Sequence, residues 1–260
     1  MRLLMAADRR ELGLDAPGVG ELLSDSDLAA LYAYPPRAAW VRANFVATVD
    51  GAASGPDGRS ASINTAADAV VFELLRALAD VVLVGAGTVR QEGYGRLTVD
   101  PRWRHLRRDP ARGLGLVLVS RRASVPRRLL AGREGAGPAM LVTCGAAPRE
   151  ALARAREALG TEQVLVCGQD RVNLPGAVDA LAERGLSRVL CEGGPSLLGD
   201  LTRSGRLDEL CLTISPLLVG GQQPRVLAGA DLRLDAEPVT LVEQDGTLMG
   251  RWLVSRPGTS

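Results

Sequence analysis

Short aliphatic runs alternate with amphipathic helical segments along most of this 260-residue chain. The runs consist mainly of Val, Leu and Ala, as strands do when both faces of a parallel sheet are buried. Strands are therefore expected at Trp40 to Val49, Asp80 to Val84, Leu114 to Val119, Ala139 to Thr143, Gln163 to Cys167 and Arg188 to Cys191. The alternation predicts an α/β fold with a mostly parallel central sheet and helices on both faces.

The helical segments carry their apolar residues at helical spacing. The clearest extends from Asn64 to Ala79, with Asn64 or Thr65 as N-cap and an apolar face formed by Val70, Val71, Leu74, Leu75 and Leu78. Three further helices are expected at 148–159, 175–184 and 195–204. Each would cross from one strand of the sheet to the next.

The two ends of the chain follow other patterns. The runs Glu209 to Ile214, Val239 to Gln244 and Leu248 to Val254 are strand-like, and the last two flank an Asp-Gly turn, which is a strong hairpin signal. The sheet should therefore finish with antiparallel strands. Residues 1–39 are expected to be an N-terminal leader with a short capped helix at Asp25 to Leu31, and residues 40–260 a single domain.

Composition excludes several classes of function. The 31 basic residues are all arginine and the net charge is +1, so no basic face for nucleic acid is expected. The four cysteines form no C-x-x-C pair, which disfavours zinc and redox motifs and favours buried thiols. The sequence shows no signal peptide and no run long enough to span a membrane, so we expect a cytoplasmic protein.

Histidine limits the hydrolytic mechanisms open to the chain. His105 is the only histidine, it lies in an arginine-rich stretch, and no G-x-S-x-G elbow accompanies it. No cluster of metal-ligating residues is present in the sequence, so no metal is expected. Serine and metal-dependent hydrolysis are therefore disfavoured, and His105 is expected on a surface loop.

Two glycine turns follow predicted strands. The first contains Gly85 and Gly87 and begins like a dinucleotide-binding fingerprint, but Arg90 replaces its last glycine. A tight strand-to-helix turn explains it equally well. The second reads Glu192-Gly193-Gly194-Pro195-Ser196, where the glycines allow a ligand close to the backbone and the proline suits the first turn of a helix. Such a helix start favours a phosphate group.

A third strand end carries hydroxyl and guanidinium groups. The sequence Ser120-Arg121-Arg122 follows the run that ends at Val119, and ligands of open α/β sheets lie beyond the carboxyl ends of strands. Two solvated arginines are the simpler explanation of this pair. Taken with the two glycine turns, however, the three strand ends favour a dinucleotide with a 2′-phosphate, which points to NADPH.

Four motifs occur in an order that is familiar. They are Arg42-Ala-Asn-Phe-Val-Ala-Thr-Val-Asp-Gly51, Leu75 to Val89, Glu192-Gly-Gly-Pro-Ser-Leu-Leu198 and Ile214-Ser-Pro-Leu-Leu-Val-Gly-Gly221. Together they resemble the reductase domain of riboflavin biosynthesis, a relative of dihydrofolate reductase, from about Trp40 to the C-terminus. The resemblance implies a dihydrofolate-reductase-like fold, a homodimer, and hydride transfer from NADPH to the ribosyl C1′ of a phosphoribosylamino-uracil.

The resemblance also implies roles for particular residues. On the substrate side these are Ser62, Arg76 and Glu192, with Asp50 and Glu192 as the catalytic candidates. On the cofactor side, the three strand ends and the resemblance together indicate Ala47, Gly85, Gly87, Thr88, Glu92, Ser120, Arg121, Arg122, Gly193, Gly194, Pro195, Ser196, Leu197 and Leu198. Glu192 could instead cap the following helix, and Asp50 could simply form its Asp-Gly turn.

The sequence departs from the family around the substrate. The zinc motifs of the deaminase half are absent, the usual tryptophan is Asn64, and D-x-P-x-L-T-x-R is replaced by a stretch starting at Glu92. The arginine for the substrate phosphate is therefore open between Arg96, Arg102 and Arg104. A pteridine reductase and a non-catalytic dinucleotide-binding protein are the alternatives. Against a pteridine, the sequence shows no clear helix-borne carboxylate after the first strand.

Overall fold

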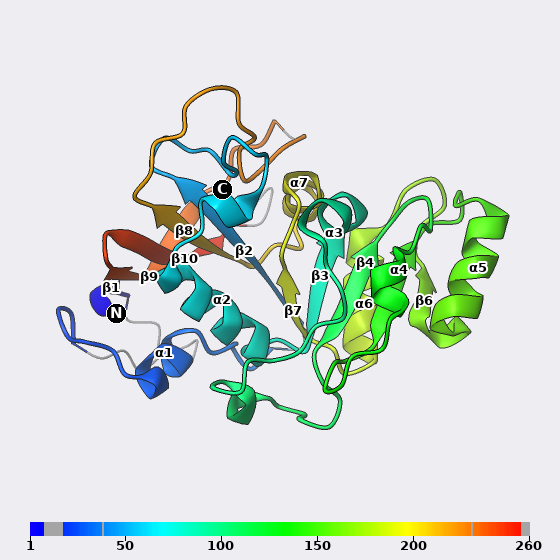
Figure 1. Ribbon diagram of the computed structural model, residues 1–260, viewed down its shortest axis with the longest axis horizontal. Helices are drawn as coiled ribbons and strands as arrows, with labels where there is room; N and C mark the ends of the chain where they lie inside the picture. The colour runs from blue at the N-terminus through cyan, green and yellow to red at the C-terminus, as the bar shows by residue number, and fades with distance from the viewer. Residues whose placement is uncertain (8–17, 38, 230, 256–260) are drawn as a thin grey trace.

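The protein is a ten-stranded sheet covered by helices on both faces (Figure 1). This computed structural model describes residues 1–7, 18–37, 39–229 and 231–255. The strand order is β1-β9-β10-β8-β2-β7-β3-β4-β5-β6. The strands are β1 (Arg2–Ala6), β2 (Trp40–Thr48), β3 (Val81–Gly85), β4 (Gly115–Val119), β5 (Ala139–Thr143), β6 (Val164–Val166), β7 (Arg188–Cys191), β8 (Glu209–Ser215), β9 (Ala236–Gln244) and β10 (Thr247–Val254).

The strand pairing changes from parallel to antiparallel at β8. The strands from β8 through β2, β7, β3, β4 and β5 to β6 pair in parallel, while β8 pairs antiparallel with β10, β10 with β9, and β9 with β1. The predicted mostly parallel sheet with antiparallel C-terminal strands is thus confirmed. The predicted strands and helices agree with the structure to within a few residues.

Alternate residues of β3 show how the two faces are covered. Val82 and Val84 belong to one core cluster, which includes residues of α1 (Asp25–Leu31), α2 (Ala66–Leu78), α3 (Ala86–Glu92), α4 (Arg127–Leu130) and α5 (Arg149–Leu159). Val81 and Leu83 belong to the other, with α6 (Leu174–Glu183) and α7 (Pro195–Arg203). Because side chains alternate across a strand, these clusters lie on opposite faces. Helices on both faces are therefore confirmed.

Helix α2 forms for the reasons that its sequence suggests, with one exception. Of the two N-caps considered, the structure has Thr65, whose hydroxyl accepts a hydrogen bond from the amide of Asp68. The expected apolar face is buried except for the half-buried Val70. The exception is Asp68, a buried carboxylate in the first turn, where a charged side chain usually faces solvent.

The leader contributes to the sheet and to the core. Strand β1 pairs with β9, and Leu28 and Leu31 of α1 pack into the core, as the capped helix predicted there would require. Buried Arg42 of β2 donates hydrogen bonds to the carbonyl groups of Tyr32 and Ala33. The described residues of the leader therefore fold as part of the same unit as the sheet.

A buried ionic cluster links this leader to the middle of the sheet. Glu209 of β8 accepts hydrogen bonds from Trp40 at 2.9 Å, from Arg42 at 2.9 Å and from Arg251 of β10 at 2.6 Å. Burial opposes the charge of Glu209, but the two guanidinium groups outweigh it and lower its pKa to about 2. The cluster fixes β2, β8, β10 and the chain after α1 relative to one another.

The predicted hairpin joins β9 to β10. Asp245 and Gly246 both have positive φ, +52° and +77°, and Gln244 pairs with Thr247 across the turn. A two-residue turn of this kind requires positive φ at both central positions, which Asp-Gly accommodates well. None of the helices in the described part of the chain is long and apolar enough to cross a membrane.

Candidate active site

A cavity of about 670 Å³ opens beyond the carboxyl ends of β2, β3 and β7. Its wall combines the end of β2, one side of α2, α3 with the loop after it, and the start of α7. Both phenylalanines of the chain, Phe45 and Phe72, line it. Ligands of open α/β sheets bind at this edge. The cavity is therefore the candidate active site.

Glu192 and Arg76, both expected at the substrate, meet in this cavity. The guanidinium group of Arg76 donates two parallel hydrogen bonds of 2.8 Å to the carboxylate of Glu192, and the hydroxyl of Tyr94 donates a third of 2.7 Å. Burial opposes the charge of Arg76, but Glu192 outweighs it and the pKa of Arg76 is raised. Glu192 therefore bonds to side chains across the cavity wall instead of capping α7.

The two glycine turns lie against each other. The amide of Gly85 donates a hydrogen bond of 2.7 Å to the carbonyl of Gly193, and the peptide bond between Gly193 and Gly194 is cis. A Cβ on Gly194 would lie 2.7 Å from the hydroxyl oxygen of Thr88, so no larger residue fits without a shift. Gly194 is also the N-cap of α7 and provides no side-chain cap, which leaves first-turn amide groups for a ligand.

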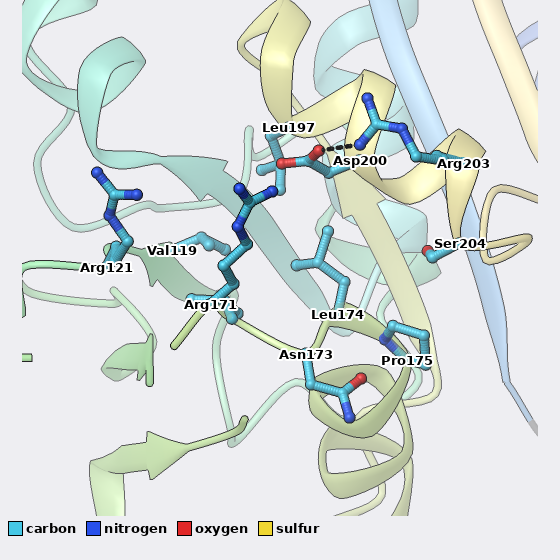
Figure 2. Close-up of a pocket in the computed structure, with 11 residues that line it drawn as sticks. Val119, Arg121, Arg171, Asn173, Leu174, Pro175, Leu197, Asp200, Arg203 and Ser204 are labelled. Carbon is cyan, nitrogen blue, oxygen red and sulfur yellow. Dashed lines mark hydrogen bonds and ion pairs between the residues drawn. The ribbon is translucent and has the colours of Figure 1, made fainter. Parts of the chain in front are cut away.

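The start of α7 separates this cavity from a second one. Gly194, Pro195 and Ser196 line the first cavity, whereas Leu197 lines a second, of about 720 Å³ (Figure 2). Arg121 after β4 and Arg171 before α6 reach the second cavity from different loops (Figure 2). Their guanidinium groups have no hydrogen-bond partner among the described residues, whereas Arg203 pairs with Asp200 at 2.6 Å. Two unpaired cations at one cavity suit an anionic ligand.

Of the other cofactor residues expected from the sequence, two line the first cavity. Thr88 and Glu92 line the first one, and the carboxylate of Glu92 accepts hydrogen bonds from the amide and hydroxyl of Ser60. Seven others line neither cavity: Ala47, Gly85, Gly87, Ser120, Arg122, Gly193 and Leu198. Ser120 is buried and accepts a hydrogen bond from the amide of Ser124.

The structure does not bring Asp50 or Ser62 into the first cavity. The carboxylate of Asp50 is exposed and accepts hydrogen bonds from Thr48 and from the amides of Val219 and Gly220. These bonds lower the pKa of Asp50, the bond from Thr48 most. The hydroxyl of Ser62 donates to Asp57 at 2.6 Å. Asp50 thus holds the turn after β8, and Ser62 organises its own loop.

Of the three arginines considered for a substrate phosphate, only Arg96 lines the cavity. Arg102 pairs with Asp25 of α1, and Arg104 lies in a separate pocket. Arg133, which the sequence did not single out, lines the cavity as well. His105 lies in a short 3₁₀ turn and is exposed, as predicted.

The sequence argument against a pteridine was wrong. Asp68 is a carboxylate on the helix after β2, and it lines the cavity. Its partner, the hydroxyl of Thr213, lies 145 residues away in β8. The signal that could have found it is an acidic residue on the apolar side of α2, next to buried Ala67 and Val71. Tyr94 and Arg171 were missed too, because each is placed by contacts distant in sequence.

The parallel sheet, the glycine turns and the cavities beyond the strand ends together define an α/β protein with a ligand site at the carboxyl edge of its sheet. The chain belongs to the family described as the RibD C-terminal domain, whose sequence model matches residues 39–247. The family belongs to riboflavin biosynthesis, as the four motifs implied.

Three comparisons place the chain within this family. A 2,5-diamino-6-ribosylamino-4(3H)-pyrimidinone 5′-phosphate reductase of Archaeoglobus fulgidus is 27% identical, over 80% of this chain and 94% of that protein. The riboflavin biosynthesis protein RibD of Bacillus amyloliquefaciens is 28% identical over 73% of this chain, which spans 49% of that longer protein. A crystal structure of a pyrimidine reductase-like protein from Corynebacterium diphtheriae is 25% identical, with a TM-score of 0.73 over 84% of this chain and 92% of that one.

Proposed function

We propose that this protein is an NADPH-dependent reductase of a phosphoribosylamino-pyrimidine, which it reduces at the ribosyl C1′. The observation that carries the proposal is the pair of cavities divided by the start of α7. A dinucleotide has two halves joined by a pyrophosphate, and a helix start that presents free amide groups favours that anion. The nicotinamide half would then lie in the first cavity, beside the substrate.

The adenosine half would lie in the second cavity. Arg121 and Arg171 reach this cavity and have no partner within the described residues, so they are suited to a 2′-phosphate. Each charged hydrogen bond contributes about 1.5–3 kcal/mol. Two such bonds correspond to a preference for NADPH over NADH on the order of a hundredfold or more.

The cofactor preference is tested by titrating both nucleotides. We expect Arg121→Ala and Arg171→Ala each to lower the ratio of NADPH to NADH affinity by about tenfold or more. Arg149→Ala, at the exposed start of α5, is the matched control and should leave the ratio unchanged. Equal affinity of the unmodified protein for the two nucleotides would remove the 2′-phosphate assignment.

The first cavity offers groups for each part of the substrate. A reduced nicotinamide supplies the hydride, so the protein's contribution is to hold the acceptor carbon in place. The rings of Phe45 and Phe72 suit a planar pyrimidine, while Arg96 and Arg133 suit its phosphate. Glu192 would act as a positioning residue, because its carboxylate is bonded to Arg76 and Tyr94.

The decisive assay follows NADPH oxidation with the phosphoribosylamino-pyrimidine as substrate. Turnover to a ribitylamino product supports the proposal, and tight NADPH binding without turnover would indicate a non-catalytic dinucleotide-binding protein. A dihydropteridine is the second candidate substrate, since Asp68 supplies the helix-borne carboxylate that such a ring needs. Assaying dihydrofolate beside the pyrimidine separates the two.

We also propose a cytoplasmic homodimer, as the family resemblance implies. All four cysteines are unpaired, which suits a reducing compartment. Val49 and Leu217 are exposed and adjacent, with the amide of Val49 bonded to the carbonyl of Leu217, and Leu218 next to them is 78% exposed. Such an apolar patch suits a subunit contact. Light scattering that gives the mass of one chain would overturn the dimer.

A further inference from the structure

A third cavity, of about 370 Å³, lies at the amino ends of β3 and β4 and shares no lining residue with the first two. Its wall is formed by parts of the segments 98–113 and 134–135. The chain between α3 and β4 passes it while running from the carboxyl ends of the parallel strands to their amino ends (Figure 1). Its charged side chains are Arg104, Arg107 and Glu134. The proposed reductase uses none of these three.

Arg107 is a buried cation that forms no ion pair with any residue that the structure describes. It is 8% exposed, and its terminal nitrogens donate to the carbonyl groups of Ala79 and Gly113, the latter at 2.6 Å. Its Nε has no hydrogen-bond partner. Asp80, the carboxylate that acts on it most, is bonded instead to Arg108 at 2.8 Å. The charge of Arg107 is therefore left without a counter-ion.

A buried guanidinium group without a counter-ion is costly. Burial lowers the pKa of Arg107, and the attraction of Asp80 and Asp109 offsets only part of this effect. Carbonyl groups satisfy its N–H donors but bring no full negative charge. An anion in the cavity would supply that charge, and the attraction between the two is stronger in these poorly solvated surroundings than in water.

The second arginine of the cavity has donors to spare. Arg104 is exposed, and its side chain makes no hydrogen bond or ion pair within the described residues. A guanidinium group presents its N–H donors as a fork that matches the oxygens of a carboxylate or a phosphate. Glu134 is exposed and likewise has no partner in the described part of the chain. Two positive charges thus face one negative charge, which favours an anionic ligand.

Two segments of the chain join the third cavity to the first. In one segment, Arg96 lines the first cavity and Thr98 lines the third; in the other, Arg133 lines the first and Glu134 the third. The Nε of Arg96 donates a hydrogen bond of 3.1 Å to the carbonyl of Leu129, just before the second segment. A ligand in the third cavity would therefore restrain both segments.

We propose that the third cavity binds a small oxyanion, through a phosphate or a carboxylate group, and that this ligand restrains the segments that bring Arg96 and Arg133 to the first cavity. Arg104 holds the anion from the solvent side, and Arg107 compensates its charge from the core. The site lies outside the proposed reductase site, so its occupancy is measured without any turnover.

Hydrogen exchange of the full chain, titrated with inorganic phosphate, succinate and chloride at equal ionic strength, tests the site. We expect the oxyanion to slow amide exchange in the segments 93–107 and 131–137, because a ligand that binds only the closed structure suppresses local opening. Slowing by phosphate identifies a phosphate site, and slowing by succinate alone identifies a carboxylate site. Equal slowing by chloride would mean general screening and would overturn the proposal.

Two exposed side chains of the cavity should change the affinity in opposite directions. Arg104→Ala removes a charged hydrogen bond and should weaken the slowing oxyanion by about tenfold or more. Glu134→Gln removes a repulsion and should strengthen it by about twofold to fivefold. Arg127→Ala is the matched control, because Arg127 is exposed on α4 outside the cavity, and it should leave the affinity unchanged.

These variants keep the test decisive even if replacement of buried Arg107 prevents folding. Slowing that Arg104→Ala leaves unchanged would mean that the ion binds elsewhere, for example at Arg96 and Arg133 in the first cavity, and would overturn the proposal. The absence of slowing by both oxyanions would overturn it as well. Neither outcome bears on NADPH oxidation, so the proposed function is judged separately.

Discussion

At the scale of single residues, the cavity combines a satisfied carboxylate with an unsatisfied one. Glu192 accepts two hydrogen bonds from Arg76 and one from Tyr94, so its charge is balanced before any ligand arrives. Asp68 accepts one bond from Thr213 and has no cation. Binding sites often keep such groups at a cost in stability. The two carboxylates should therefore respond in opposite ways to neutral substitution.

The buried carboxylate of Asp68 should make the unfolding free energy of the protein depend on pH. Its pKa is about 6 in the folded protein and 3.8 without burial, so the folded state binds more protons between these values. Stability is therefore lost as the pH rises from about 4 to 6, by ~3 kcal/mol. Asp68→Asn should raise the unfolding free energy by about 1–3 kcal/mol at pH 8 and by much less at pH 4, as measured by urea unfolding. An equal effect at both pH values would contradict this explanation.

Residues of the site could be predicted from sequence where the motif itself places them. Glu192 and Gly194 lie directly after a strand that its aliphatic residues predict, so their position at the sheet edge follows from the chain alone. Asp68 and Arg171 could not be found in this way. Asp68 becomes a site residue only when β8 brings Thr213 against α2, and Arg171 only when its loop meets Arg121.

At the scale of elements, the site depends on how closely two strand-to-helix turns approach. The turn from β3 into α3 and the turn from β7 into α7 are joined by the bond from Gly85 to Gly193, and Thr88 lies against Gly194. This approach sets where the first turn of α7 presents its amide groups. A small displacement there would change the contact proposed for the cofactor without unfolding either helix.

Gly194→Ala tests this approach. The backbone of Gly194 is extended, so alanine can adopt it, but the new Cβ would lie 2.7 Å from the Thr88 hydroxyl oxygen. We expect NADPH affinity to fall by about tenfold and the unfolding free energy by about 1–3 kcal/mol. In the Gly194→Ala, Thr88→Ala double variant the clash is gone, so its losses should be smaller than the sum of the single losses. Additive losses would exclude the steric explanation.

The elements themselves were predictable to different degrees. The parallel strands and α2 were found because burial on both faces, or on one helical face, leaves a regular pattern. Strand β1 could not be predicted from the sequence, because Arg2–Ala6 is short and its partner β9 is more than 200 residues away. The turn after β3 allowed either a ligand contact or a tight turn, and the structure places α3 directly after it.

At the scale of the whole molecule, the Arg42, Glu209 and Arg251 cluster joins distant parts of the chain. The two arginines are among the largest fully buried side chains of the described residues, and Glu209 between them has no exposed surface. Removing one member of such a cluster leaves an uncompensated charge in the core, at a cost of about 3–5 kcal/mol. The cluster therefore determines how firmly the leader is attached to the sheet.

Glu209→Gln should lower the unfolding free energy by about 3–5 kcal/mol at pH 7. The pKa of Glu209 is depressed to about 2, so its contribution is present above the ordinary value of 4.5 and is lost as the pH falls toward 2. The difference between the variant and the unmodified protein should therefore shrink below pH 4. Limited proteolysis should also cleave the variant first near α1. A difference that stays constant down to pH 2 would contradict the assignment.

The position of β1 in the sheet also sets the order in which the molecule can be completed during synthesis. Strand β1 is made long before its partner β9, which begins at Ala236. At about 5–20 residues per second, the ribosome needs on the order of ten to fifty seconds to deliver that partner. Until then, β1 lacks the strand that it pairs with in the folded protein, and a chaperone that shields it would prevent it from pairing with another chain.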